Sequence, residues 1–323
     1  MRFKLQSLWG SAKLMVAAAF WYCLGMRVRA KNRLYMALHP FVPVVNRNLK
    51  RAPGICAAQD HVSKEDRARM EEAIASWQEP PLIAIVMPVY NTDEAHLKAA
   101  LKSVREQVYP HWQLCIADDA STAPHIRPLL ERAEREDSRI KVIFRQENGH
   151  ISHATNSALQ CVEGPFVALM DHDDTLPAHA LYHVAREIIR HPDVDLIYSD
   201  EDKIREDGTL AGPHFKPDWN EELFLTQNYI NHLTVIRRSL LEKVGGLRPG
   251  FEGSQDHDLV LRIVRETQPE RIRHIPRILY HWRAFDGSQL LLRPCPQQGS
   301  GSQTTGCQRL SGVKAPRSRH IRD

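Results

Sequence analysis

From residue 82 onward, short apolar runs alternate with segments of helical periodicity, and this alternation constrains the fold of the chain more than any other feature. Apolar runs bounded by turn signals predict buried strands. Strands are expected at residues 82–87, 112–117, 140–145, 166–170 and 196–199, and helices at 92–108, 124–136, 150–161 and 177–191. Such β-α alternation predicts a mainly parallel sheet with helices on both faces, a Rossmann-like α/β fold.

The rest of the chain divides around this central domain. Residues 1–80 predict a helical N-terminal extension that ends at a proline pair, and residues 81–288 form the α/β domain. Residues 289–323 are basic, of low complexity and without periodicity, which predicts a disordered tail. With 323 residues, about one large domain plus appendages is expected.

The charge pattern points to an anionic surface rather than to nucleic acid. The net charge is only +4, and the basic residues concentrate near the two ends of the chain. The six cysteines form no C-x-x-C pair, which suits a reducing compartment and argues against a zinc site.

An apolar run at residues 14–26 is too short for an ordinary transmembrane helix. Nearby aromatic and cationic residues favour an interfacial helix that contacts a membrane surface peripherally. A helix packed on the catalytic domain explains the run equally well, so both interpretations stay open.

Polar and acidic residues follow four of the five predicted strands. They are Pro88–Asn91, Asp118 with Asp119, Asp171–Asp174, and Asp200–Asp202. Ligands of open α/β sheets bind at the carboxyl ends of the strands, so these residues predict a ligand site. The preference of Asp and Asn for turns explains one or two such groups, but not the whole set.

The group Asp171–Asp174 is the most informative of the four. Its three carboxylates repel one another unless a cation lies among them. Carboxylate oxygens suit Mg²⁺ or Mn²⁺, so Asp171, Asp173 and Asp174 are candidate metal ligands.

Two further candidates lie later in the chain. Asp256 falls in the first turn of a helix expected to begin near Ser254, where a carboxylate either interacts with the helix dipole or serves as a general base. His281 and Arg283 follow a short apolar run and could bind diphosphate oxygens, although a surface cation beside a buried tryptophan is the simpler explanation.

Taken in order, these residues resemble a known family. The chain carries the motifs PVYN, DDAS, NGHISHATNSAL, MDHDD, YSDEDK, FKPDWN, GSQDHDLVLR and LYHWR. Their order and spacing resemble the family 2 glycosyltransferases with a GT-A fold, and especially the bacterial rhamnosyltransferase and O-antigen branch. The resemblance covers residues 81–283, nearly two thirds of the chain.

The resemblance implies roles for individual residues. Tyr90 and Asp119 would contact the nucleobase and ribose of a nucleotide-sugar donor, Asp171 and Asp173 would form the Asp-x-Asp metal motif, and Asp256 would be the general base. The full set of implied donor-binding residues is Pro88, Tyr90, Asn91, Asp118, Asp119, Asp171, Asp173, His281 and Arg283.

The implied activity is an inverting, metal-dependent transfer of a sugar to a saccharide or lipid-linked acceptor. Rhamnose is the sugar suggested by the branch, and synthesis of cell-surface polysaccharide is the implied setting. Such an enzyme is expected in the cytoplasm, with peripheral contact at the cytoplasmic face of the inner membrane.

Two alternatives stay open. A sugar nucleotidyltransferase would carry a Gly-rich, basic loop after the first strand, and PVYN is not such a loop. A non-catalytic remnant that binds nucleotide-sugar or a partner is the second. The tail after Ser288 resembles no relative and looks like the product of a truncation or frameshift, which favours a remnant, whereas the intact Asp256 favours an enzyme.

Overall fold

A computed structural model describes residues 60–283 of the chain. These residues belong to one compact unit. The apolar run at 14–26 and the tail at 289–323 lie outside the described residues, so the predictions made for them remain predictions.

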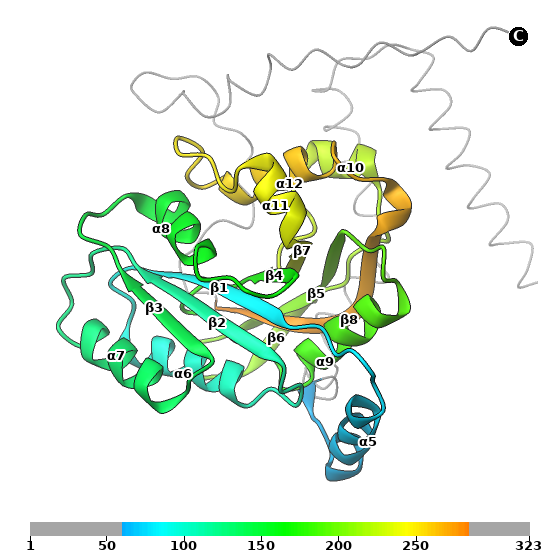
Figure 1. The fold of residues 1–323 in the computed structure, drawn as a ribbon, viewed down its shortest axis with the longest axis horizontal. Coiled ribbons are helices and arrows are strands. Elements are labelled where there is room, and N and C mark those ends of the chain that lie inside the picture. The colour runs from blue at the N-terminus through cyan, green and yellow to red at the C-terminus, as the bar shows by residue number, and fades with distance from the viewer. Residues whose placement is uncertain (1–59, 284–323) are drawn as a thin grey trace, which may run out of the picture. The chain divides into compact units, whose positions relative to one another are not determined.

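Within residues 60–283, eight strands form a single sheet (Figure 1). The strands are β1 (Ile83–Val89), β2 (Trp112–Asp118), β3 (Ile140–Phe144), β4 (Phe166–Leu169), β5 (Leu196–Ile204), β6 (Leu210–His214), β7 (Thr234–Arg237) and β8 (Ile272–Arg283). Their order is β3-β2-β1-β4-β7-β5-β6, and β8 pairs with β5.

Eight α-helices accompany the sheet in the same part of the chain. They are α5 (Lys64–Ala75), α6 (Glu94–Arg105), α7 (Ile126–Glu136), α8 (His150–Leu159), α9 (Ala180–Arg190), α10 (Glu221–Thr226), α11 (Arg238–Val244) and α12 (Gln255–Ile263). The predicted strands and helices exist, with ends that shift by a few residues.

The sheet is mainly parallel, as predicted, but it also contains antiparallel pairs. Strands β3, β2, β1 and β4 are parallel, as predicted, and β8 is parallel to β5. However, β7 runs antiparallel to both of its neighbours, β4 and β5, and β6 runs antiparallel to β5. The link from β5 to β6 is a tight turn at residues 205–209, and so short a connection joins only antiparallel strands.

The strand predicted at 196–199 is longer than expected, which changes the interpretation of one acidic group. Strand β5 continues to Ile204, so Asp200, Glu201 and Asp202 lie inside the strand and are buried. They do not follow a strand end, and each of them contacts a partner from a neighbouring element. The sequence pattern failed here because charged residues rarely occur in a buried strand unless they are paired.

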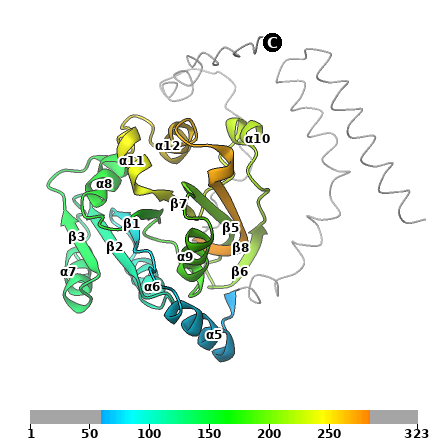
Figure 2. The same cartoon turned by 45° about the vertical axis from the view of Figure 1, so that its right-hand side comes forward.

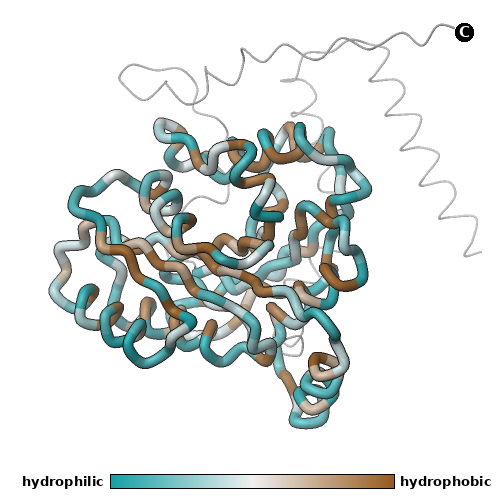
Figure 3. Tube along the Cα trace, in the orientation of Figure 1, coloured by the Kyte–Doolittle hydropathy of each residue, from teal (hydrophilic) through white to brown (hydrophobic). Residues whose placement is uncertain are grey.

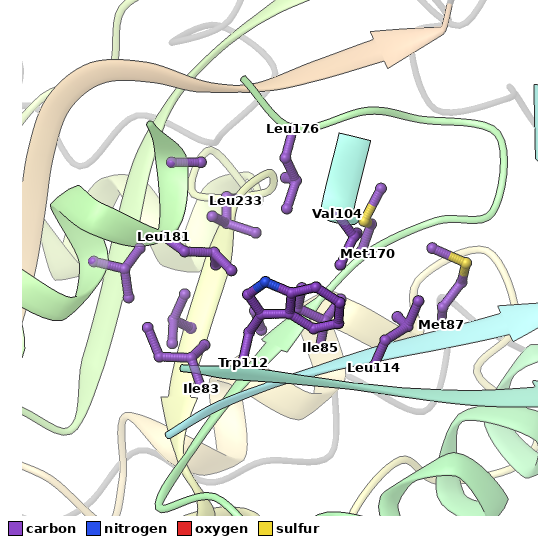
Figure 4. Packing of buried hydrophobic residues seen from close by; sticks show 14 of the residues in the cluster. Ile83, Ile85, Met87, Val104, Trp112, Leu114, Met170, Leu176, Leu181 and Leu233 are labelled. Carbon is purple, nitrogen blue, oxygen red and sulfur yellow. The ribbon is translucent and has the colours of Figure 1, made fainter. Parts of the chain in front are cut away.

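Helices cover both faces of the sheet, each over its own apolar core. Alternate residues of β1 point to opposite faces, so Ile83 and Ile85 join the core under α6, α7 and α9, while Ala84 and Val86 join the core under α8, α11 and α12. Figure 4 shows Trp112 at the centre of the first core. In Figure 3 the central strands are largely apolar and the outer helices α6 and α7 are largely polar.

Helix α5 belongs to the first core, although it precedes the predicted domain boundary at residue 80. Its residue Ile74 is buried there, and Trp77, just after the helix, stacks on Tyr182 of α9 with ring centroids 5.6 Å apart. Residues 60–80 therefore pack as part of the α/β domain.

Helix α12 is fixed by a buried charge cluster around Asp258. The carboxylate accepts hydrogen bonds from Arg262, at 3.0 Å on the next turn, and from Arg248 in the preceding loop. Arg262 also donates to the carbonyls of Val244 and Gly246, each at 2.7 Å. Asp258 therefore ties α12 to the end of α11 and sets the position of the residues at the start of α12.

We expect Asp258→Asn to lower the free energy of unfolding by about 3 kcal/mol, because two arginines would lose a buried carboxylate partner. The matched control is Glu94→Gln, which breaks an exposed pair with Lys98 and should cost no more than about 1 kcal/mol. Urea unfolding of both variants measures the difference. Equal losses would show that the cluster does not fix α12.

Candidate active site

A pocket of about 460 Å³ opens at the carboxyl ends of β1, β2 and β4. It is lined by Pro88, Val89, Tyr90, Asp119, Asn148, His150, Ile151, Ala154, Asp171, His172 and Asp173. Five of the predicted donor-binding residues thus surround one cavity. A larger groove of about 590 Å³ lies between α6 and α7, but none of the predicted site residues lines it.

The loop after β1 places an aromatic ring at the rim of this pocket. Tyr90 is 46% exposed, which is unusual for a large aromatic side chain and leaves its face free to stack on a flat ligand. Asn91, at φ 46°, accepts hydrogen bonds from the backbone N–H groups of Thr122 and Ala123, at 2.8 and 2.9 Å. Asn91 therefore holds the loop after β2 in place, and its predicted contact with the donor is corrected to a supporting role.

The two aspartates at the end of β2, Asp118 within the strand and Asp119 just after it, are both buried. Asp119 lines the pocket and accepts hydrogen bonds from Arg145, at 2.7 Å, and from the backbone N–H of Gly149, at 3.0 Å. Asp118 accepts from the N–H of Ser121 and is not among the lining residues. The structure therefore brings Asp119, but not Asp118, to the predicted donor site.

Gly149 is required where it lies. A Cβ atom there would come within 2.6 Å of the Arg145 guanidinium and 2.8 Å of His153. The absence of a side chain lets the start of α8 approach Asp119 closely, which closes one wall of the pocket.

Asp171 and Asp173 face the pocket, whereas Asp174 does not. Asp174 is fully buried and accepts hydrogen bonds from the Tyr280 hydroxyl, at 2.6 Å, and from the N–H of Arg283, at 2.7 Å. Burial, followed by the charges of Asp171 and Asp173, raises the pKa of Asp174 well above its usual value.

The predicted set of three metal ligands is therefore corrected. Among residues 60–283, no three His, Cys, Asp or Glu side chains are arranged to hold a metal ion. Asp171 and Asp173 remain as two hard oxygen donors at the pocket, which fits a cation that takes its other ligands from a bound diphosphate and water.

His281 is also removed from the donor site. Its Nδ1 lies 2.5 Å from the carboxylate of Asp202 and its Nε2 lies 3.2 Å from that of Asp60. Burial alone would lower the pKa of His281, but the hydrogen bonds with these two carboxylates, and their charges, raise it to about 9. Both ring nitrogens are occupied, so His281 stabilises the fold instead of contacting a donor.

Arg283 stays beside the pocket. Its Nε donates to the carbonyl of Asp173 at 2.7 Å, which places the guanidinium next to the candidate metal-binding residues. Its backbone N–H at the same time supports Asp174.

Asp256, in the first turn of α12, faces this group of residues. Burial raises the pKa of Asp256 to about 6, and the charge of Asp171 adds to the rise. The charge of His232 and hydrogen bonds from Asn231 and Gln255 act in the opposite direction. Asp171 therefore lies close enough for its charge to act on Asp256, as a donor-binding residue near a general base would need to.

Sequence reasoning missed Asn231 and His232. The His232 ring lies 3.7 Å from the Asp171 carboxylate and stacks on Tyr280 with ring centroids 4.8 Å apart. These two residues precede β7, and because β7 is antiparallel, its amino end meets the carboxyl end of β4. Only the direction of β7, which a single sequence does not reveal, could have placed them at the site.

The signal that could have drawn attention to them lies in the motifs YSDEDK and FKPDWN. The buried Lys216 Nζ donates to the carbonyls of Ile230, at 3.1 Å, and His232, at 2.5 Å, and it pairs with Glu201. Glu201 in turn accepts from the N–H of His232. A buried lysine and glutamate in these two motifs thus fix the backbone on either side of Asn231.

Proteins of known family are similar to the part of the chain that contains this pocket. The family model of "Glycosyl transferase family 2" matches residues 84–245, about half of the chain, including the pocket. The chain belongs to glycosyl transferase family 2.

Two curated relatives are similar to this chain over about 70% of its length. The uncharacterized protein y4gI of Sinorhizobium fredii is 48% identical over 220 residues, which are 68% of this chain and 24% of that protein. The O-antigen biosynthesis protein RfbC of Myxococcus xanthus is 41% identical over 231 residues, 72% of this chain and 18% of that protein. The chain spans a quarter or less of the length of these two relatives.

Solved structures confirm the fold of this chain. S. aureus TarS 1–349 in complex with UDP-GlcNAc superposes with a TM-score of 0.53 and 19% identity, covering 66% of this chain and 61% of that chain. The predicted GT-A fold is therefore confirmed. Among residues 60–283, no helix has the length and apolarity needed to cross a membrane.

We expect the contacts of His281 with Asp202 and Asp60 to make the free energy of unfolding of the protein depend on pH. The folded pKa of His281, about 9, lies above the ordinary value of 6.5, so the stabilisation is complete below pH 6.5 and is lost as the pH rises through 9. The difference corresponds to about 3 kcal/mol. Urea unfolding from pH 6 to 10 should show this loss in the wild type and not in His281→Asn.

The control for this experiment is His191→Asn, since His191 is exposed and pairs with Glu187 at the end of α9. Its profile should follow the wild type. If wild type and His281→Asn had parallel pH profiles, the charged state of His281 would not stabilise the fold.

Proposed function

We propose that the protein is an inverting glycosyltransferase that moves a sugar from a nucleotide-diphosphate sugar to a saccharide or lipid-linked acceptor. The observation that carries the proposal is the position of Asp256, a partly buried carboxylate with a raised pKa that lies near Asp171, a residue of the pocket lining. A carboxylate with a pKa near the working pH is suited to act as a general base.

On the donor side, we assign Tyr90 and Asp119 to the nucleoside, and Asp171, Asp173 and Arg283 to the diphosphate. The pocket volume of about 460 Å³ suits a ligand of nucleotide size. TarS, which shares the fold, forms a complex with UDP-GlcNAc, and this supports a nucleotide-sugar donor. Mn²⁺ or Mg²⁺ held by Asp171 and Asp173 would supply Lewis-acid stabilisation of the leaving diphosphate.

On the acceptor side, Asp256 removes a proton from the attacking hydroxyl group. The acceptor oxygen then forms a bond to the anomeric carbon while the bond from that carbon to the donor phosphate breaks. Attack comes from the face opposite the leaving group, so the anomeric configuration inverts. Asp256 and the donor carboxylates must face each other for this displacement, and the effect of the Asp171 charge on the pKa of Asp256 supports that arrangement.

The biological setting is proposed from the relatives and the sequence motifs. RfbC is named for O-antigen biosynthesis, which supports a role in cell-surface polysaccharide synthesis. Rhamnose is the sugar suggested by the motif resemblance, and a cytoplasmic enzyme in peripheral contact with the inner membrane is the matching location.

We expect one nucleoside diphosphate, or its sugar, to stabilise the protein in a Mn²⁺-dependent manner. A ligand at 100 times its dissociation constant stabilises by about 2.7 kcal/mol. A thermal-shift panel with and without Mn²⁺ measures this effect. In Asp173→Ala the Mn²⁺-dependent part should disappear, whereas the control Asp207→Ala, in the exposed turn after β5, should keep it.

Retained Mn²⁺-dependent binding by Asp173→Ala would refute the metal assignment. No stabilisation by any nucleotide, from folded protein, would favour the non-catalytic remnant.

We expect Asp256→Asn to lower kcat by about 10²- to 10⁴-fold, the usual contribution of a general base, and to leave donor affinity nearly unchanged. In the wild type, kcat should rise as the pH increases through about 6, because Asp256 must be ionised to accept a proton. Release of nucleoside diphosphate from the donor that the thermal-shift panel identifies measures both effects. The control Asp218→Asn alters an exposed carboxylate of the same charge. Full activity of Asp256→Asn would sink the general-base assignment.

A further inference from the structure

The Asp256 carboxylate receives two amide hydrogen bonds, one from Gln255 and one from Asn231. Gln255 Nε2 donates to Oδ2 at 3.1 Å, and the Asn231 side chain supplies the second hydrogen bond. Gln255 belongs to the same helical turn as Asp256, whereas Asn231 comes from the segment before β7. Asn231 is therefore the contact that ties the orientation of Asp256 to the opposite wall of the site.

An asparagine side chain can present either its NH₂ group or its carbonyl to a neighbour, so its orientation must be set by other contacts. The Thr234 hydroxyl donates to Asn231 Oδ1 at 2.7 Å. With the carbonyl oxygen held by Thr234, the NH₂ group faces Asp256. In the reversed orientation a carbonyl oxygen would face a carboxylate, and two acceptors would oppose each other.

Thr234 itself has little freedom to move. It is fully buried and begins β7, where it pairs with Leu169 of β4 on one side and Tyr198 of β5 on the other. The central part of the sheet therefore fixes the hydroxyl that orients Asn231.

The backbone around Asn231 is held independently by the buried pair of Lys216 and Glu201. Lys216 binds the carbonyls of Ile230 and His232, one residue before and one residue after Asn231. Backbone and side chain of Asn231 are thus restrained by separate groups, which is the arrangement expected of a residue that orients another.

We propose that Asn231 is a positioning residue for the general base Asp256, and that Thr234 locks its amide in the donating orientation. The inference rests on the proposed function of Asp256. Asn231 fixes the rotation of the carboxylate, leaves an oxygen directed at the acceptor hydroxyl, and stabilises the ionised form by donating to it.

Two charged groups also act on Asp256. His232 comes from the same segment as Asn231 and favours the ionised carboxylate, and Asp171 comes from the end of β4 and disfavours it. The neutral amides of Gln255 and Asn231 add a stabilisation that does not depend on the protonation of a neighbour.

The test is a direct titration of Asp256 by ¹³C NMR of carboxyl-labelled protein, with the resonance assigned by Asp256→Asn. Thr234→Val and Asn231→Ala should raise the pKa of Asp256 from its wild-type value by about 0.5 to 1 unit, because each disrupts a hydrogen bond to the ionised form. Thr234→Ser keeps the hydroxyl and should retain the wild-type pKa. This measurement requires neither donor nor acceptor.

Kinetics with the same nucleotide-sugar donor supply the second readout. Thr234→Val should lower kcat by about tenfold, as expected for a misoriented catalytic group, with the KM for the donor changed less than about twofold. The acid limb of the pH profile should move upward together with the pKa of Asp256.

The matched control is Thr267→Val, which removes another buried threonine hydroxyl, bonded to Asp195 at the amino end of β5. It should lower stability without changing the pKa of Asp256 or kcat. If Thr234→Val left both the pKa and kcat unchanged while Asp256→Asn was inactive, the positioning role would be refuted and the general base retained. An active Asp256→Asn would instead refute the proposed function itself.

Discussion

The antiparallel pairing of β7 between β4 and β5 is the constraint on which the site depends. The register places Thr234, the first residue of β7, beside Leu169, the last residue of β4. The chain that enters β7 therefore passes the point where the chain leaving β4 delivers Asp171. This meeting brings His232 within 3.7 Å of Asp171 and Asn231 into contact with Asp256. A parallel β7 would have carried these residues to the opposite edge of the sheet. Figure 2 shows β7 beside β5.

Around this meeting point, hydrogen bonding divides the carboxylates into two groups. Asp174 and Glu201 accept hydrogen bonds from the protein's own N–H and O–H groups and do not line the pocket, so they are occupied by structural contacts. Asp171 and Asp173 line the open pocket. An isolated buried carboxylate is unstable unless it is paired, protonated or exposed, and each member of the first group has one of these solutions. The carboxylates of Asp171 and Asp173, in contrast, face the pocket.

The sequence predicted the parallel half of the fold and the residues that follow its strands. Apolar runs located β1, β2 and β4, and the acidic groups after them identified Asp119, Asp171 and Asp173 at one pocket. The sequence did not reveal which charged side chains are buried in structural contacts, because the spacing of residues does not reveal their hydrogen-bond partners. Asp174 and His281 belong to the motifs that the sequence singled out. However, Asp174 accepts a hydrogen bond from Tyr280, and His281 is hydrogen-bonded to Asp202 and Asp60.

In the role proposed for it, Asp256 needs both burial and hydrogen-bond donors. Burial raises its pKa and increases its strength as a base, but a pKa raised too far would leave it protonated at neutral pH. Hydrogen bonds from Gln255 and Asn231 oppose this rise, and they also fix the direction of the oxygens. The pKa near 6 is thus a balance between desolvation and the Asp171 charge, which raise it, and the His232 charge and the two amides, which lower it. Since Thr234 belongs to the sheet core, the same packing that joins β4 to β5 also sets the strength of the base.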